Sequence, residues 1–142
     1  NSYRRLVPGG AAPINVEWGH DNRSAGLRIP ISPDSARRVE NRLPGSDANP
    51  YLAIAASLAC GYLGMKNALE PRDPVIGNAY RNDHQLPRGL LEALIALEEC
   101  EELRAILGRR FSHVYLALKR SEFEEFMRVI SPWEREHLLL SV

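Results

Sequence analysis

The pattern of apolar and polar positions changes character near residue 48. Before that point, short stretches of alternating polarity are separated by turn-forming sequence: PINVEWG (13–19), NRSAGLRIPI (22–31) and RRVENRL (37–43). Alternation with a period of two is typical of strands that bury one face. In the first stretch, Ile14, Val16 and Trp18 are expected to share one face. We therefore predict antiparallel strands over about residues 1–43.

From Asn49 onward the pattern is helical. Asn49 is a favourable N-cap and Pro50 suits the first helical position. The sequence that follows, YLAIAASLACGYLGMKNAL (51–69), is almost wholly apolar or small, and a helix that is apolar on every side is expected to be buried. The rest predicts a loop at 70–87, a helix with a break at 88–107, an amphipathic helix at 110–130 and a short final helix at 133–142. Strands followed by helices predict an α+β fold.

Length and composition limit the class of protein. The chain of 142 residues has room for one domain. It begins at Asn1 rather than Met, which we interpret as a fragment of a longer protein. No apolar run approaches the length of a membrane span. Cys60 and Cys100 lie in apolar helical sequence, so we expect two buried, reduced thiols, as in a cytoplasmic protein.

The charge is balanced over the whole chain but not along it. There are 18 basic and 18 acidic residues in total, whereas residues 1–42 hold seven arginines against four acids and no lysine. A nucleic-acid-binding domain usually carries a basic excess throughout, so we expect no nucleic acid partner. Arginine is the side chain that grips a carboxylate or phosphate with two parallel hydrogen bonds.

One stretch places a carboxylate between two of these arginines. If residues 38–42 are a strand, Arg38, Glu40 and Arg42 point to the same side of the sheet. The flanking cations would keep Glu40 ionised, and an ionised carboxylate can bind Mg²⁺ together with substrate phosphates. This arrangement suits phosphoryl transfer, although no Walker A pattern is present. The alternative is a solvated row of surface ion pairs that contributes little.

Four motifs resemble the C-terminal half of the glutamine synthetase catalytic domain, in the order and spacing of that family: NSYRRLVPG (1–9), NRSAGLRIP (22–30), ARRVENR (36–42) and ANPYLAIAA (48–56). The ending SPWEREHLLLSV (131–142) also resembles the C-terminus of that family. The resemblance implies that residues 1–142 are a C-terminal fragment of such a domain. Its strand-rich active-site part would span residues 1–47 and its helical part residues 48–142.

The resemblance also implies the nucleotide side of a site. Arg28 and Arg38 match arginines at the phosphates of ATP, and Glu40 matches a glutamate that binds Mg²⁺ or Mn²⁺. The further metal ligands of the family precede the matched part, so the fragment alone is expected to be inactive.

The substrate side follows from three other arginines. Arg5 matches the arginine that holds the α-carboxylate side of glutamate. Arg23 matches a catalytic arginine at the transferred phosphoryl group, and Arg42 matches one at the side chain of glutamate. The implied reaction is an ATP-dependent ligation in which ATP phosphorylates the γ-carboxylate of glutamate and a nitrogen nucleophile attacks the acyl phosphate. Homo-oligomers are expected for the full-length protein.

One departure from the family bears on the nucleophile. Ammonia-using members carry glutamate in the sequence VPGxEAP, whereas this chain reads VPGGAAP and has Ala11 at that position. Loss of the carboxylate resembles the γ-glutamylpolyamine synthetase branch, in which the nucleophile is an alkylamine. WGHDNRS (18–24) and GNAY (77–80) also resemble that branch. The alternatives are a glutamine synthetase that uses ammonia and a member without catalytic activity.

Overall fold

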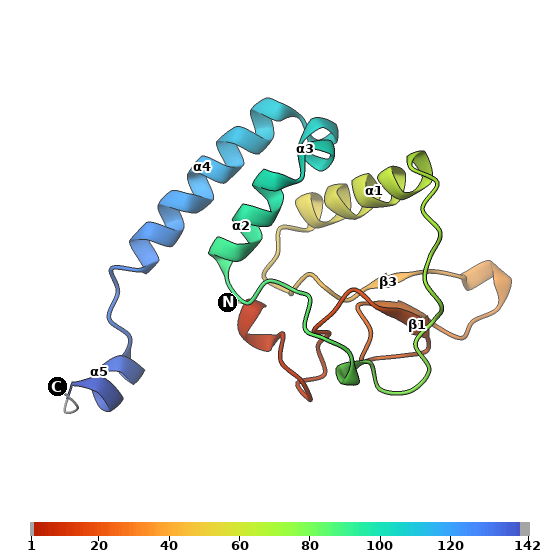
Figure 1. Ribbon diagram of the computed structural model, residues 1–142, viewed down its shortest axis with the longest axis horizontal. Helices are drawn as coiled ribbons and strands as arrows, with labels where there is room; N and C mark the ends of the chain where they lie inside the picture. The colour runs from red at the N-terminus through yellow and green to blue at the C-terminus, as the bar shows by residue number, and fades with distance from the viewer. Residues whose placement is uncertain (1, 140–142) are drawn as a thin grey trace.

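The computed structural model describes residues 2–139. It confirms the α+β class: a small sheet with long loops forms one part of the molecule, and the helices follow (Figure 1). Helix α1 lies beside the sheet part, and α4 and α5 extend away from it on the other side. The sheet strands are β1 (Trp18–His20), β2 (Leu27–Ile29) and β3 (Glu40–Asn41), and 3-10 turns occur at Ser2–Arg5, Asp34–Ala36 and Ala79–Arg81.

The sheet is mixed and shorter than the sequence predicts. Its order is β1-β2-β3. Strands β2 and β3 are antiparallel, with Arg28 opposite Glu40, but β1 and β2 are parallel, so the antiparallel prediction is wrong for this pair. Each of these two strands has three residues, a length of roughly 10 Å. The short connection 21–26 can therefore return the chain to the same end of the sheet.

The first predicted strand is instead an irregular, buried segment. Ile14 and Asn15 are both buried, and Val16 is exposed, so the predicted alternation fails. The cause is a long-range contact: the carbonyl of Ile14 accepts hydrogen bonds from the backbone N–H groups of Gln85 (2.9 Å) and Leu86 (3.2 Å). Because residues 85 and 86 cover it, the segment around Ile14 is buried on both sides, whereas a strand of the predicted kind would bury only one.

The segment responsible is the arch, which we define as residues 70–87. It has almost no regular structure and follows residues 12–24 through side-chain and backbone hydrogen bonds. The indole N–H of Trp18 donates to the carbonyl of Arg72 (2.6 Å), and the N–H of Val75 donates to the carbonyl of Trp18 (2.8 Å). The amide of Asn22 donates to the carbonyl of Gly77 (2.8 Å). The arch thus adds a wall beside the sheet.

The helices begin and end close to their predicted limits. Asn49 caps α1 by accepting hydrogen bonds from the N–H groups of Tyr51 and Leu52, and Ser131 forms a capping box with Glu134. The break predicted within residues 88–107 falls at Cys100. The helices are α1 (Pro50–Lys66), α2 (Leu90–Glu99), α3 (Glu101–Leu107), α4 (Arg109–Phe126) and α5 (Pro132–Leu138); residues 140–142 of the predicted final helix lie outside the described residues.

Helix α1 is not buried, which corrects the prediction made from its composition. Tyr51 is 82% exposed and Leu58 is 70% exposed. The helix packs against α3, so one side is covered within the described chain. An apolar stripe remains open: Tyr51, Ile54, Leu58, Tyr62 and Met65.

The two cysteines are likewise exposed rather than buried. Both lie where α1 and the α2–α3 junction meet. Partial desolvation raises the pKa of the Cys60 thiol, and the nearby Cys100 adds a smaller upward contribution. Between residues 2 and 139, no helix is both long and apolar enough to cross a membrane.

Gly26 is expected to be a position that tolerates no side chain. A Cβ atom there would lie 2.5 Å from the carbonyl oxygen of Asn15 and 3.1 Å from Cδ2 of Leu43. Gly26→Ala should therefore lower the free energy of unfolding by about 1–3 kcal/mol, measured by urea denaturation. Gly61→Ala in α1 is the control, because a Cβ there meets nothing within 4 Å; it should be neutral or stabilise the helix by up to about 1 kcal/mol. Equal effects of the two substitutions would contradict the close contact.

Candidate functional site

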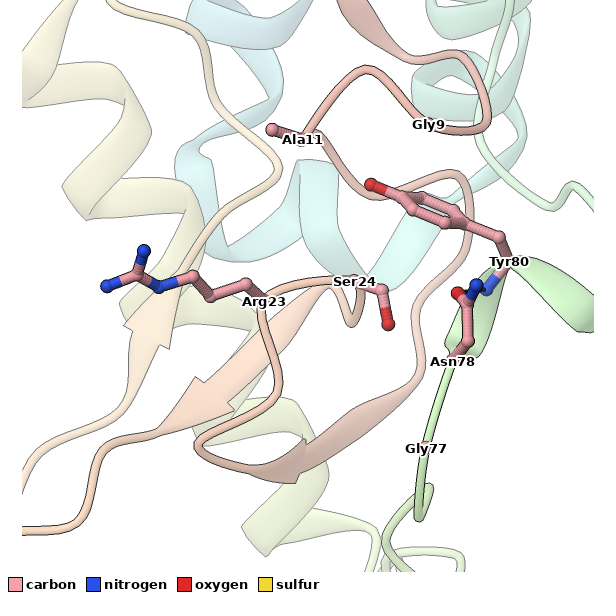
Figure 2. A pocket seen from close by; sticks show the side chains of 7 residues that line it. All are labelled: Gly9, Ala11, Arg23, Ser24, Gly77, Asn78 and Tyr80. Carbon is pink, nitrogen blue, oxygen red and sulfur yellow. Dashed lines mark hydrogen bonds between the residues drawn. The ribbon is translucent and has the colours of Figure 1, made fainter.

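An open hollow of about 410 Å³ lies between the start of the chain and the arch (Figure 2). Figure 2 shows Ser24, Asn78 and Tyr80 facing it, with the side chain of Arg23 extending away from them. Arg23 is exposed to solvent. The complete lining is Gly9, Ala11, Arg23, Ser24, Gly77, Asn78 and Tyr80.

Local hydrogen bonds and one long-range hydrogen bond place the polar side chains of the hollow. The side-chain oxygen of Asn22 accepts from both the N–H (3.0 Å) and the hydroxyl (2.7 Å) of Ser24. The hydroxyl oxygen of Ser24 in turn accepts from the N–H of Ala79 (2.8 Å). In the arch, Asn78 accepts from the N–H of Tyr80 (2.9 Å). Asn-initiated turns of this kind set both walls of the hollow.

The roof of the hollow is the 9–12 loop, by which we mean Gly9 to Ala12. Gly9 (φ 79°) and Ala11 (φ 58°) both adopt left-handed backbone conformations, which cost a non-glycine residue about 1–2 kcal/mol. The carbonyl of Ala11 accepts a hydrogen bond from the guanidinium of Arg42 (2.8 Å). The carbonyl of Ala12 accepts one from the hydroxyl of Tyr80 (3.0 Å). Contacts from two separate parts of the chain therefore hold the loop in its strained conformation.

A second feature is the ion-pair cluster, formed by Asp21, Arg28, Arg38 and Glu40. Arg28 donates to one oxygen of Glu40 (2.7 Å) and also to Asp21. Arg38 reaches the other oxygen of Glu40 at 3.4 Å. The register of β2 and β3 explains the main contact, because Arg28 and Glu40 are cross-strand partners. The side chain of Arg28 is 15% exposed and that of Arg38 is 54% exposed.

The cluster keeps Glu40 ionised. The hydrogen bond from Arg28 is the main cause that holds the pKa of the Glu40 carboxyl below its ordinary value; partial desolvation opposes it and Arg38 assists. An ionised carboxylate suits Mg²⁺, which often takes one or two protein carboxylates together with phosphates and water. Among residues 2–139 no group of three His, Cys, Asp or Glu side chains could hold a metal ion. The Glu40 carboxylate therefore has the chemistry of a single oxygen ligand for a cation.

Arg5 and Arg42 form a third group. Arg5 donates to the backbone carbonyls of Arg42 (3.3 Å) and Leu43 (2.5 Å), and the N–H of Arg42 donates to the carbonyl of Gly26 (2.9 Å). The guanidinium of Arg42 then turns to the 9–12 loop. The structure thus brings Arg28, Arg38 and Glu40 together, joins Arg5 to Arg42, and places Arg23 at the hollow.

Several residues of the site were not identified from the sequence. Asp21 shares Arg28 with Glu40, and the polar walls of the hollow come from Asn22, Ser24, Asn78 and Tyr80. The sequences DNRS and GNAY each contain an asparagine that favours a turn, because its side-chain oxygen can accept a hydrogen bond from the backbone N–H two residues later. Nothing local indicates that the two sequences meet, because 55 residues separate Ser24 from Ala79.

The pH dependence of the ion-pair cluster can be tested at Arg28. Arg28→Gln should raise the pKa of Glu40, measured by NMR titration of its side chain. Because the folded pKa is depressed, the stabilisation from this pair is present above the ordinary glutamate pKa of 4.5 and is lost as the pH falls through the lower folded value. The stability difference between wild type and Arg28→Gln should therefore shrink in acid. Arg38→Gln is the control and should move the pKa of Glu40 less; a larger shift would contradict the assigned order of causes.

Comparison with known proteins gives a consistent result. The family model "Glutamine synthetase, catalytic domain" matches residues 1–138. A glutamate–isopropylamine ligase of a Pseudomonas species is 42% identical over 138 residues, 94% of this chain and 30% of the relative. Gamma-glutamylputrescine synthetase PuuA of Escherichia coli K12 is 42% identical over 140 residues, covering 98% and 30%. Glutamine synthetase of Methanocaldococcus jannaschii is 37% identical over 149 residues, covering 99% and 33%.

A solved structure agrees with the sequence relatives. The ligand-free structure of GmaS superposes with a TM-score of 0.80 at 35% identity, and the match covers 96% of this chain and 32% of that one. The chain spans about a third of the length of the proteins it matches. Since the family model covers nearly all of its residues, the chain belongs to the glutamine synthetase catalytic-domain family.

Proposed function

We propose that the protein carrying this chain is an ATP-dependent ligase that joins an alkylamine to the γ-carboxylate of glutamate through a γ-glutamyl phosphate. The observation that carries the choice of nucleophile is Ala11. Its methyl group lines the hollow beside Arg23, where ammonia-using members of the family carry a glutamate. Removing a carboxylate at this point removes a group that attracts ammonium and leaves space for a carbon substituent. Two of the similar relatives are named for isopropylamine and putrescine ligation.

The ion-pair cluster supports the nucleotide side of this proposal. Arg28 is nearly buried and bonded to Glu40 and Asp21, so its task is to orient the Glu40 carboxylate and keep it ionised. Arg38 is mostly exposed and keeps donors for the phosphates of ATP. A bound Mg²⁺ or Mn²⁺ would neutralise phosphate charge during transfer. Glu40 would supply one of its oxygen ligands.

The other arginines support the glutamate side. Arg23 is exposed at the hollow and can neutralise the transferred phosphoryl group. Arg5 and Arg42 are joined through the carbonyl of Arg42, so they would present one continuous cationic wall to substrate glutamate. We assign the α-carboxylate to Arg5 and the reacting side chain to Arg42.

The remaining assignments concern the whole protein. We propose that it is a cytoplasmic homo-oligomer and that the 142-residue chain alone does not turn over ATP, because Glu40 is one ligand and residues 2–139 contain no full metal-binding group. A polyamine such as putrescine is the amine we favour. Glutamine synthesis from ammonia is the second candidate, since the M. jannaschii glutamine synthetase matches 99% of the chain at 37% identity.

Release of ADP by the full-length protein tests this function. Glutamate and MgATP should support ADP release with putrescine, isopropylamine or ethanolamine at a kcat/KM well above that with ammonium chloride. The 142-residue chain, assayed in parallel, should release none. Ammonia as the best nucleophile would favour the second candidate, and a full-length protein inactive with every amine and with ammonia would exclude the ligase.

Ala11→Glu tests the choice of nucleophile at a single residue. Ala11 already has a left-handed φ, so replacing it with glutamate should add no further backbone strain. The added side chain should fill the hollow and lower kcat/KM for the alkylamine by at least about tenfold, while the new carboxylate should raise kcat/KM for ammonia.

Ala11→Gln is the matched control because it has the same size and no charge. It should lose alkylamine activity without gaining ammonia activity. If both variants keep wild-type amine kinetics, position 11 does not face the nucleophile.

A further inference from the structure

The hydroxyl of Tyr80 connects the arch to the roof of the hollow. It donates to the carbonyl of Ala12 at 3.0 Å across 68 residues of sequence. Figure 2 shows the ring lying along the hollow with its hydroxyl pointing toward the loop that carries Ala11. Tyr80 therefore has two surfaces: the ring forms a wall and the hydroxyl holds the neighbouring backbone.

The position of Tyr80 is itself fixed by a buried anchor. The preceding residue, Ala79, is fully buried. Its carbonyl accepts from the side-chain amide of Asn15 (2.9 Å), and its N–H donates to Ser24 (2.8 Å). Asn78 closes the turn by accepting from the N–H of Tyr80. Three hydrogen bonds thus fix the backbone at Ala79 and at the N–H of Tyr80, from which the Tyr80 side chain extends.

The 9–12 loop is the element that needs to be held. Ala11 is in a left-handed conformation, which is strained for a residue other than glycine, so a local rearrangement that relieves this strain would be favourable. Two side chains oppose such a rearrangement by binding consecutive carbonyls: Arg42 holds Ala11 and Tyr80 holds Ala12. Because Ala11 lines the hollow, the width of the hollow depends on both of these hydrogen bonds.

We propose that Tyr80 is a positioning residue that fixes the 9–12 loop and thereby sets the part of the hollow that receives the amine nucleophile. The inference rests on the proposed function and deepens it. The carbon substituent of a primary amine would rest between the methyl group of Ala11 and the ring of Tyr80. Glutamate and ATP would bind at the arginines described above, so loss of the hydroxyl should affect the amine selectively.

Tyr80→Phe in the full-length protein is the test, because it keeps the ring and removes the hydrogen bond. Hydrogen–deuterium exchange of the peptide that spans residues 7–14 should become faster. The KM for isopropylamine or putrescine should rise about three- to tenfold, while the KM values for ATP and glutamate and the kcat should change less than about twofold. Tyr62→Phe on helix α1 is the matched control and should leave exchange at residues 7–14 and every KM unchanged.

The two readouts separate this inference from the proposed function. Wild-type exchange at residues 7–14 in Tyr80→Phe would overturn the anchoring role, whether or not the protein is a ligase. Faster exchange with an unchanged amine KM would overturn the link between the loop and the nucleophile. If the wild-type protein turns over no amine, the proposed function fails and with it the amine part of the inference, and the exchange experiment still decides whether Tyr80 anchors the loop.

Discussion

The hydrogen bonds that hold the backbone of Ala79 are the constraint on which the candidate site depends. The arch has almost no secondary structure of its own, so its place beside the sheet is decided by a few contacts. At Ala79, both the N–H and the carbonyl are bonded to side chains, Ser24 and Asn15, within a site that excludes solvent. Leaving such groups unpaired would cost about 1–3 kcal/mol each. This penalty makes the two hydrogen bonds at Ala79 a strong anchor for the arch. The anchored arch in turn forms the second wall of the hollow.

The arginines divide into those whose guanidinium donors already bond to this chain and those that stay exposed. Arg28 and Arg5 give their guanidinium donors to carboxylates and backbone carbonyls of this chain. Arg23 and Arg38 remain exposed. A site for phosphates needs both kinds, because a free cation orients an anionic ligand only if its neighbours are fixed. The arginines that flank β3 are therefore unequal and do not share one face as the sequence predicted: Arg38 contacts Glu40, whereas Arg42 turns away to Ala11.

Local signals in the sequence predicted the local structure, and contacts between distant residues decided the rest. The cap at Asn49 and a break within residues 88–107 were predicted, because each depends on a few adjacent residues. The pairing of Glu40 with arginine was foreseen, but its main partner Arg28 required the register of β2 and β3. The burial of residues 13–15 and the contact of Tyr80 with Ala12 both depend on chain segments far apart in sequence. Periodicity carries no information about such contacts.

The exposed face of α1 shows the limit of reading burial from composition. An apolar side chain is buried only where a neighbour covers it, and within the described residues α1 has α3 on one side. The stripe from Tyr51 to Met65 repeats at three- and four-residue steps, the spacing of a helix that packs on one face. Exposed apolar area of this kind is characteristic of a surface that meets other protein. The strand-rich part differs, because its polar anchors at Ala79 and its cross-strand pair at Arg28 are satisfied within the chain. The arrangement of the candidate site is therefore set by contacts of this chain itself, whereas burial of α1 requires additional protein.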